Sequence, residues 1–264
     1  MTTLRELWDS GRPTVGGWST IPSAFSAELL GRSGFDWVCI DTQHGLAGQD
    51  VMVEQLQALA ITGTPGFVRV TWNEPDLIMR ALDAGAQGVI VPMVNSADDA
   101  RQATGACRYA PRGYRSWGPI RAALGRPDFS VETANREVVC AVMVETEQAL
   151  RNLDEILSVE GVDAVYVGPS DLAVSLGLQP TGDPTEPRHV EAIEQIVEGC
   201  RRHGVVAGIH CGSVETAQRW LARGFSMVNV NNDAIFVRTT GSAVMKALKQ
   251  EPAPAEAASK SGYA

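Results

Sequence analysis

The chain has 264 residues, of which 44% are hydrophobic and 20% are charged, as in an ordinary globular protein. Its formal net charge of -9 argues against a nucleic-acid partner, which favours a basic surface. No apolar run is long enough to span a membrane, and the N-terminus lacks the apolar segment of a secretion signal. The length matches one (β/α)8 barrel, which needs about 250 residues.

Strand and helix patterns alternate along the chain up to about residue 250. A helix over residues 1–13 comes first, and the Pro-, Ala- and Ser-rich tail over 251–264 is predicted to be disordered. The predicted strands cover residues 15–19, 38–40, 66–71, 88–92, 138–144, 163–167, 205–209 and 226–230. The predicted helices cover residues 22–32, 49–61, 74–83, 97–107, 128–136, 147–157, 188–203, 213–223 and 234–250.

One pattern occurs four times and predicts the fold. Each copy has a glycine, an apolar residue, a polar residue and then a strand rich in valine or isoleucine, and the copies begin at Gly34, Gly85, Gly161 and Gly224. Each glycine follows a helical pattern and suits a left-handed helix stop. The copies lie about two βα units apart, which predicts the even strands of a single (β/α)8 barrel followed by one additional C-terminal helix.

The segment 109–119 interrupts this rhythm. It is rich in Gly, Pro, Arg and aromatic residues and is too long for a plain connector. Its composition favours an ordered segment at the mouth of the barrel, or a lid over it.

The cysteine pattern indicates a reducing compartment. No C-x-x-C pair occurs among Cys39, Cys107, Cys140, Cys200 and Cys211. The odd count and the position of Cys39 and Cys140 within apolar strands are typical of buried thiols in a cytoplasmic protein.

The three lysines argue against Schiff-base chemistry. Lys246, Lys249 and Lys260 all lie near the C-terminus, away from every predicted strand end. An enzyme that forms a Schiff base through a lysine amine would need that amine inside the barrel.

Polar side chains follow several predicted strands, and in a closed barrel they converge on one mouth. These residues are Asp41, His44, Arg69, Glu145 and Asp171. Two carboxylates with water and a chelating ligand make an oxygen-rich octahedral site, which suits Mg²⁺, Mn²⁺ or Co²⁺. The alternative is that Asp171 caps a helix and Glu145 only complements a helix dipole.

Three further features of these strand ends have a functional and a structural interpretation. Backbone N–H groups over residues 168–171 could hold a substrate carboxylate, or form an ordinary turn. Asp41 could orient the His44 ring and raise its basicity. Arg69 needs an anionic partner, which is either a reacting oxyanion, a carboxylate of the site or a purely structural ion pair.

The remaining histidines are weaker candidates for the active site. His210 and Cys211 are adjacent on a strand and point to opposite faces, so His210 is expected only as an outer neighbour of the site. His189 and His203 lie on a predicted surface helix and are expected to be solvated.

At these residues the chain resembles the HpcH/HpaI family of metal-dependent pyruvate aldolases, over about residues 10–240. The motifs that carry the resemblance are Ala27-Glu-Leu-Leu, Gly34-Phe-Asp-Trp, Asp41-x-x-His-Gly45, Val68-Arg-Val-x-Trp-Asn-x-Pro75, Val91-Pro-Met-Val94, Tyr109-x-Pro-x-Gly-x-Arg115, Glu145-Thr146 and Val167-Gly-Pro-Ser-Asp-Leu172.

The resemblance implies a hexamer built as a trimer of dimers, with the C-terminal helix exchanged between subunits. It implies a divalent metal held by Glu145 and Asp171, Arg69 at the pyruvyl oxygen, and His44 with Asp41 handling protons. It also implies that the substrate carboxylate meets backbone amides of Gly168, Pro169, Ser170 and Asp171, and that Trp18 lies near the site.

Two departures from the family pattern concern neighbours of the site. Many members have Glu where this chain has Gln43, and Gln where it has Met143. Both changes alter the polarity of the site, which leaves the aldehyde and the choice between pyruvate and hydroxypyruvate open.

The expected reaction is reversible cleavage of a 4-hydroxy-2-keto acid to pyruvate (or hydroxypyruvate) and an aldehyde. One alternative is a citrate-lyase-like or malyl-CoA-lyase-like enzyme, in which Arg112, Arg115 and Arg121 would bind the CoA tail. A second alternative is a catalytically silent barrel that binds metal and keto acid.

Overall fold

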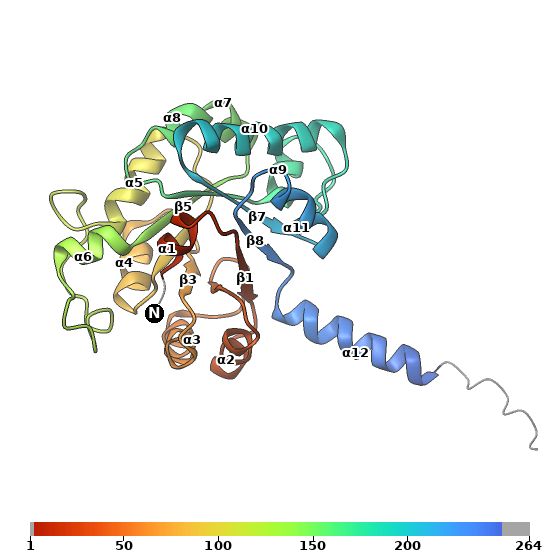
Figure 1. The fold of residues 1–264 in the computed structure, drawn as a ribbon, viewed down its shortest axis with the longest axis horizontal. Helices are drawn as coiled ribbons and strands as arrows, with labels where there is room; N and C mark the ends of the chain where they lie inside the picture. The colour runs from red at the N-terminus through yellow and green to blue at the C-terminus, as the bar shows by residue number, and fades with distance from the viewer. Residues whose placement is uncertain (1–2, 250–264) are drawn as a thin grey trace, which may run out of the picture.

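Eight short parallel strands close into a barrel in the computed structural model, which describes residues 3–249 (Figure 1). Each strand pairs with its neighbours in sequence, and the first strand pairs with the last. The strands are β1 Thr14–Ser19, β2 Trp37–Asp41, β3 Gly66–Arg69, β4 Gly88–Val91, β5 Val139–Val144, β6 Ala164–Val167, β7 Val206–Cys211 and β8 Met227–Val230. The predicted (β/α)8 barrel is therefore confirmed, while the predicted tail over 251–264 lies outside the described residues.

The helices are α1 Leu4–Asp9, α2 Ala24–Arg32, α3 Gln49–Thr62, α4 Pro75–Asp83, α5 Ala97–Cys107, α6 Val131–Glu137, α7 Glu147–Arg151, α8 Leu153–Leu157, α9 Pro169–Ser175, α10 Pro187–His203, α11 Val214–Leu221 and α12 Asp233–Lys249. Helix α1 precedes the first strand, the helices from α2 to α11 lie between the strands in sequence and cover the outside of the barrel, and α12 follows the last strand. The single helix predicted over 147–157 was wrong, because the chain turns at Asn152 and forms two short helices there.

The four repeated glycines have the conformation that their pattern predicts. The φ angles of Gly34, Gly85, Gly161 and Gly224 are 90°, 99°, 94° and 101°. Only glycine adopts these angles without steric cost, so each one ends the preceding helix and redirects the chain. The strands that follow are β2, β4, β6 and β8, which confirms the interpretation as even strands.

Alternation along the strands divides the apolar residues into two cores. In β5, Val139, Ala141 and Met143 belong to the core inside the barrel, whereas Cys140 and Val142 belong to the core under the helices. This two-residue period is the pleat of a strand. The barrel is thus filled with side chains. The inward phase of a strand, meaning the alternate residues whose side chains point into the barrel, decides which residue reaches the mouth.

The segment 109–119 lies at the base of the barrel, not at its mouth. Arg108 binds Asp163, just before β6, and the backbone N–H of Tyr109 donates to Asn135, just before β5. Arg115 pairs with Asp83, the last residue of α4. The prediction of a mouth or lid segment was wrong because the segment follows a helix, and loops that follow helices in this fold face the N-terminal ends of the strands.

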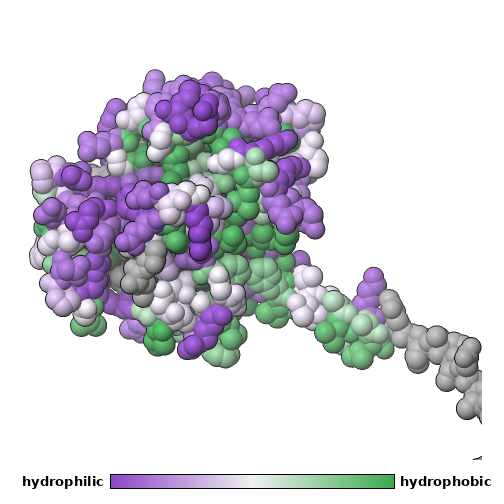
Figure 2. Space-filling view, in the orientation of Figure 1, coloured by the Kyte–Doolittle hydropathy of each residue, from purple (hydrophilic) through white to green (hydrophobic). Residues whose placement is uncertain are grey.

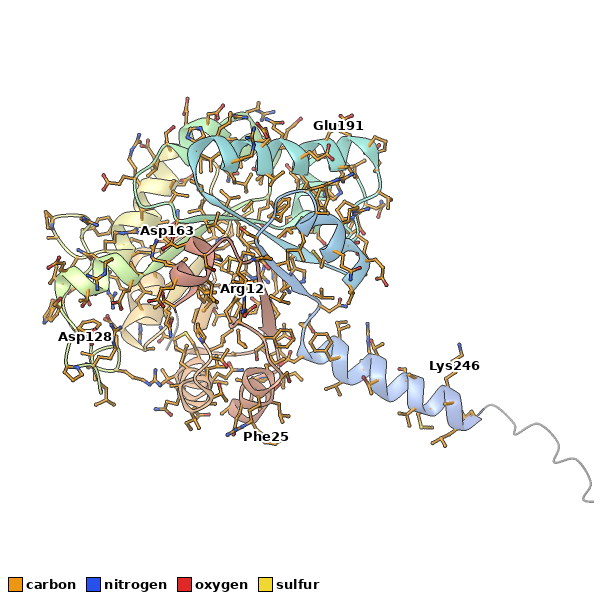
Figure 3. The ribbon with its side chains drawn as sticks, viewed as in Figure 1. Arg12, Phe25, Asp128, Asp163, Glu191 and Lys246 are labelled. Atoms are coloured by element: carbon orange, nitrogen blue, oxygen red, sulfur yellow. The ribbon has the colours of Figure 1, made fainter. Side chains whose placement is uncertain are left out.

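Helix α12 projects away from the barrel (Figure 1), and its exposed apolar side chains are visible in Figure 2. They are Val237, Val244, Met245 and Leu248. Lys246, labelled in Figure 3, and Lys249 also lie on this helix, far from the mouth. Between residues 3 and 249, no helix is both long and apolar enough to cross a membrane.

Candidate active site

The inward phase of the strands brings most of the predicted site residues together. Asp41, Arg69 and Glu145 each lie two residues beyond a member of the inner core: Cys39, Phe67 and Met143. Because side chains alternate, each of the three points into the barrel at its C-terminal rim. Trp18 on β1 and His210 on β7 face the same interior, with ring centroids 5.1 Å apart.

Asp41 and Arg69 form a buried ion pair. The guanidinium donates to both carboxylate oxygens, with Nε 3.0 Å from Oδ1 and Nη2 2.5 Å from Oδ2. Trp18 donates its indole N–H to Oδ2 at 3.1 Å and lies under the guanidinium, 5.1 Å away. Burial alone would raise the pKa of Asp41, but the hydrogen bonds and charge of Arg69 lower it below its ordinary value. The anionic partner that Arg69 requires is thus a carboxylate of the site itself.

The same carboxylate fixes the loop after β2. Asp41 Oδ1 accepts the backbone N–H groups of Gln43 and His44 at 3.0 and 3.1 Å. Within residues 3–249 the His44 ring makes no hydrogen bond to Asp41, and the side chain is exposed at the mouth. Asp41 therefore positions His44 through the backbone rather than through the ring.

Glu145 is buried at the end of β5 with 2% of its surface exposed. Its Oε1 accepts the backbone N–H of Met93 at 2.8 Å, while Oε2 lies against Gly168 so closely that a Cβ there would collide with it. Burial, and to a lesser extent the charge of Asp171, raises the pKa of Glu145 to about 7. A buried carboxylate beside a second acid is an arrangement that a divalent cation would stabilise.

Asp171 lies in the first turn of α9 and is exposed. It does not cap this helix, because the N-cap is Gly168 and no side chain bonds there. Helix α7 is capped by Thr146, not by Glu145. Neither carboxylate therefore caps a helix, whereas Asp171 lies in the first turn of α9, where its charge also complements the helix dipole.

The donor set fits a metal ion only if other ligands complete it. In the part of the chain that the structure describes, no group of three or more His, Cys, Asp and Glu side chains could hold a metal. Glu145 and Asp171 offer two hard oxygen ligands, the kind that Mg²⁺ and Mn²⁺ prefer together with water and substrate oxygens.

The other three histidines differ in their exposure to solvent. Burial, together with the charge of Arg69, lowers the pKa of His210 to about 4, so its ring is neutral beside Trp18. His189 was predicted to be solvated, but only 1% of it is exposed. It occupies the inward face of α10, where the apolar periodicity of the helix gives no sign of a buried imidazole. His203 is exposed, as expected.

The arginines considered for a CoA tail do not line the mouth. Arg115 binds Asp83, and Arg121 donates to the carbonyls of Ala84 and Leu56. Arg115 lies in the segment 109–119 at the base of the barrel, and Arg121 follows just after it.

Met143, one of the two departures from the family pattern, is packed in the core inside the barrel.

Comparison with known proteins identifies the family. A family model described as HpcH/HpaI aldolase/citrate lyase matches residues 15–239. The chain belongs to this family. A hydroxypyruvate/pyruvate aldolase of Rhizorhabdus wittichii is 42% identical over 233 residues, which cover 88% of this chain and 93% of that protein. A 4-hydroxy-2-oxo-heptane-1,7-dioate aldolase of Escherichia coli is 39% identical over 239 residues, covering 89% and 90%.

Solved structures agree with this assignment. The crystal structure of an HpcH/HpaI aldolase/citrate lyase family protein from Burkholderia cenocepacia J2315 superposes with a TM-score of 0.85 at 32% identity, over 92% of this chain and 98% of that one. The family membership and the aldolase relatives confirm the expectation of an enzyme, a carbon–carbon lyase of the aldolase type.

Sequence reasoning missed several residues of the site. Met93 holds Glu145 through its backbone, and both Tyr166 and Asn229 are buried in the barrel, where the Tyr166 hydroxyl donates to Asn229 Oδ1. The Tyr166 ring stacks on Trp18 at 5.6 Å. The inward phase of β6 and β8 could have located Tyr166 and Asn229, but nothing in the residue type of Met93 marks a backbone donor.

Proposed function

We propose that this protein is a divalent-metal-dependent aldolase that reversibly cleaves a 4-hydroxy-2-keto acid to pyruvate or hydroxypyruvate and an aldehyde. The observation that carries the proposal is the buried Glu145 carboxylate, which lies beside the turn that bears Asp171 and across the mouth from the Asp41–Arg69 pair. The names of the relatives from R. wittichii and E. coli support this class of substrate.

Glu145 and Asp171 hold the metal, which is Mg²⁺, Mn²⁺ or Co²⁺. When bound, the ion supplies a Lewis acid for the 2-keto oxygen. Oε1 of Glu145 accepts the Met93 N–H, which would leave Oε2 available to bind a cation. Asp171 is exposed in the first turn of α9, and within residues 3–249 its carboxylate accepts no side-chain or backbone hydrogen bond.

Arg69 stabilises the negative charge that develops on the pyruvyl oxygen. Its Nε and Nη2 groups are engaged by Asp41, and its Nη1 group has no hydrogen-bond partner among residues 3–249. A preorganised donor of this kind costs no reorientation during the reaction. Trp18 supports the guanidinium from below.

The remaining roles belong to the rim. His44, exposed and fixed by its backbone, accepts the proton of the C4 hydroxyl as the carbon–carbon bond breaks. Backbone N–H groups over residues 168–171, with Pro169 contributing none, hold the substrate carboxylate. Gln43 and the apolar Met143 lie next to these groups and influence the choice of aldehyde and donor.

A panel of aldehydes with pyruvate or hydroxypyruvate tests the proposal directly. Activity is expected with Mg²⁺, Mn²⁺ or Co²⁺ and is expected to vanish with EDTA. Glu145→Ala and Asp171→Ala should each abolish metal-dependent turnover while circular dichroism shows a folded barrel. Full activity of either variant, or of protein stripped of divalent ions, would contradict the metal assignment.

The two alternative functions predict different outcomes. Turnover of malyl-CoA with none on pyruvate and aldehydes would favour a CoA-thioester lyase, although Arg115 and Arg121 lie at the wrong end of the barrel for that role. Metal-loaded protein that binds pyruvate without exchanging its methyl protons in D2O would favour a silent barrel.

The assembly that the family resemblance implies is a hexamer with α12 exchanged between subunits. The exposed apolar residues of α12, Val237, Val244, Met245 and Leu248, support it, because burial of such a face against a second copy removes it from water. Light scattering after size exclusion should give the mass of six chains.

The five cysteines are free and buried, in keeping with a cytoplasmic location.

A further inference from the structure

A closed ring of contacts surrounds the Glu145 carboxylate and passes through Asn95, a residue that the proposed mechanism does not use. Glu145 Oε1 accepts the backbone N–H of Met93 at 2.8 Å. The carbonyl of Met93 accepts the Asn95 side-chain amide, Nδ2, at 2.9 Å. The hydroxyl of Thr146 donates to Asn95 Oδ1, and Thr146 follows Glu145 in the chain. The ring therefore returns to its starting residue.

Asn95 is itself held on both sides through its backbone. Its N–H donates to Asp99 Oδ2 at 3.0 Å, in the first turn of α5. Its carbonyl accepts Asn152 Nδ2 at 2.8 Å, at the break between α7 and α8. All four polar groups of Asn95 are thus engaged, and they join the loop after β4 to the loop after β5.

The ring explains an unusual backbone conformation at Met93. This residue has φ of 56°, in the left-handed region that non-glycine side chains disfavour. Such a conformation persists only where the surroundings fix it. Here Asn95 holds the carbonyl of Met93 and Glu145 holds its N–H, so both peptide groups of the residue are restrained.

We propose that Asn95 is a positioning residue that fixes the Glu145 carboxylate for metal binding. Asn95 keeps the Met93 N–H aimed at Oε1, which leaves Oε2 directed toward Gly168 and the turn that bears Asp171. The inference rests on the proposed role of Glu145 as a metal ligand. Outer partners of this kind commonly contribute about 10- to 100-fold to metal affinity.

Two asparagine variants separate positioning from general stability. Asn95→Ala opens the ring, whereas Asn73→Ala removes a comparable hydrogen bond outside it, from Asn73 Nδ2 to the carbonyl of Asp99 at 3.0 Å. Asn73 is buried and contacts the same helix start. Mn²⁺ binding to the full-length, metal-free chain is measured by calorimetry at pH 8, with thermal unfolding recorded in parallel. Asn95→Ala should bind Mn²⁺ at least about 10-fold more weakly, and Asn73→Ala should match the wild type.

A second pair of variants decides the matter if Asn95→Ala fails to fold. Thr146→Ser keeps the hydroxyl that donates to Asn95 and caps α7, and Thr146→Val removes it. Weaker Mn²⁺ binding by Thr146→Val than by Thr146→Ser supports the ring. If Asn95→Ala binds Mn²⁺ as tightly as Asn73→Ala, and Thr146→Val as tightly as Thr146→Ser, the positioning role of Asn95 is wrong while the metal site stands. If the wild-type protein binds no more Mn²⁺ than Glu145→Gln does, both the metal site and the positioning role of Asn95 are wrong.

Discussion

Replacing Asp41 with asparagine tests whether Arg69 depends on a buried counter-charge. The side chains of Asp41 and Arg69 are 2% and 11% exposed. Every group that contacts either oxygen of Asp41 is a donor, so the new amide meets donors whichever way it faces. Removing one partner of a buried pair costs about 3–5 kcal/mol. A loss near the lower end, about 3 kcal/mol, corresponds to a fall in Tm of roughly 6–12 °C for a chain of this size.

Thermal unfolding and kinetics check this prediction. Asp41→Asn should also lower kcat/KM by at least about 100-fold, since Arg69 is no longer fixed, while Mn²⁺ affinity changes little. The control is Glu28→Gln, which breaks the exposed Arg32–Glu28 pair and should cost less than about 1 kcal/mol. An Asp41→Asn variant with wild-type Tm and activity would refute the reasoning.

Four further outcomes are expected at the same site. Gly168→Ala should weaken Mn²⁺ binding by at least about 10-fold with little change in Tm. The reason is that the added methyl collides with Glu145 Oε2 and meets Met143 Cε at 3.0 Å. Unchanged Mn²⁺ affinity would show that the turn can relax. Mn²⁺ affinity should rise between pH 6 and pH 8, because burial and then Asp171 raise the pKa of Glu145 to about 7 and a proton competes below it. The same shift means that the metal-free protein loses stability as pH rises from 4.5 toward 7, and a Glu145→Gln variant should lack both trends. His44→Ala should lower kcat while leaving Mn²⁺ affinity intact, which a metal titration beside steady-state kinetics decides.

The fold could be predicted from the sequence because its signals are local and repeated. The glycines at 34, 85, 161 and 224 end helices and precede strands, and that pattern alone locates every second strand. The break at Asn152 could not be predicted, since the side-chain hydrogen bond made there goes to a carbonyl 57 residues away in the chain. The segment 109–119 was predicted at the mouth from its composition, although its position after a helix places it at the base of the barrel.

The gathering of the candidate site residues at one end of the barrel could be predicted, but their contacts could not. Polar residues at strand ends identified Asp41, Arg69 and Glu145, because strand phase determines which side chains face the mouth. The sequence paired Asp41 with the His44 ring three residues away, whereas the structure pairs it with Arg69 across the neighbouring strand. Pairing between strands depends on register, which a pattern within one strand does not contain.

The charges at the mouth predict the order in which metal and substrate bind. Asp41 and Arg69 neutralise each other, so above pH 7 Glu145 and Asp171 leave two negative charges that repel the carboxylate of a keto acid. A divalent cation offsets both charges, which predicts that metal binds before substrate. By calorimetry at pH 8, pyruvate should bind Mn²⁺-loaded protein at least about 10-fold more tightly than metal-free protein, a difference of about 1.4 kcal/mol. Metal-free Glu145→Gln should bind pyruvate more tightly than metal-free wild type, because one repelling charge is gone while Arg69 is unchanged. Equal pyruvate affinity in all of these states would mean that the fixed charges of the protein do not control substrate binding.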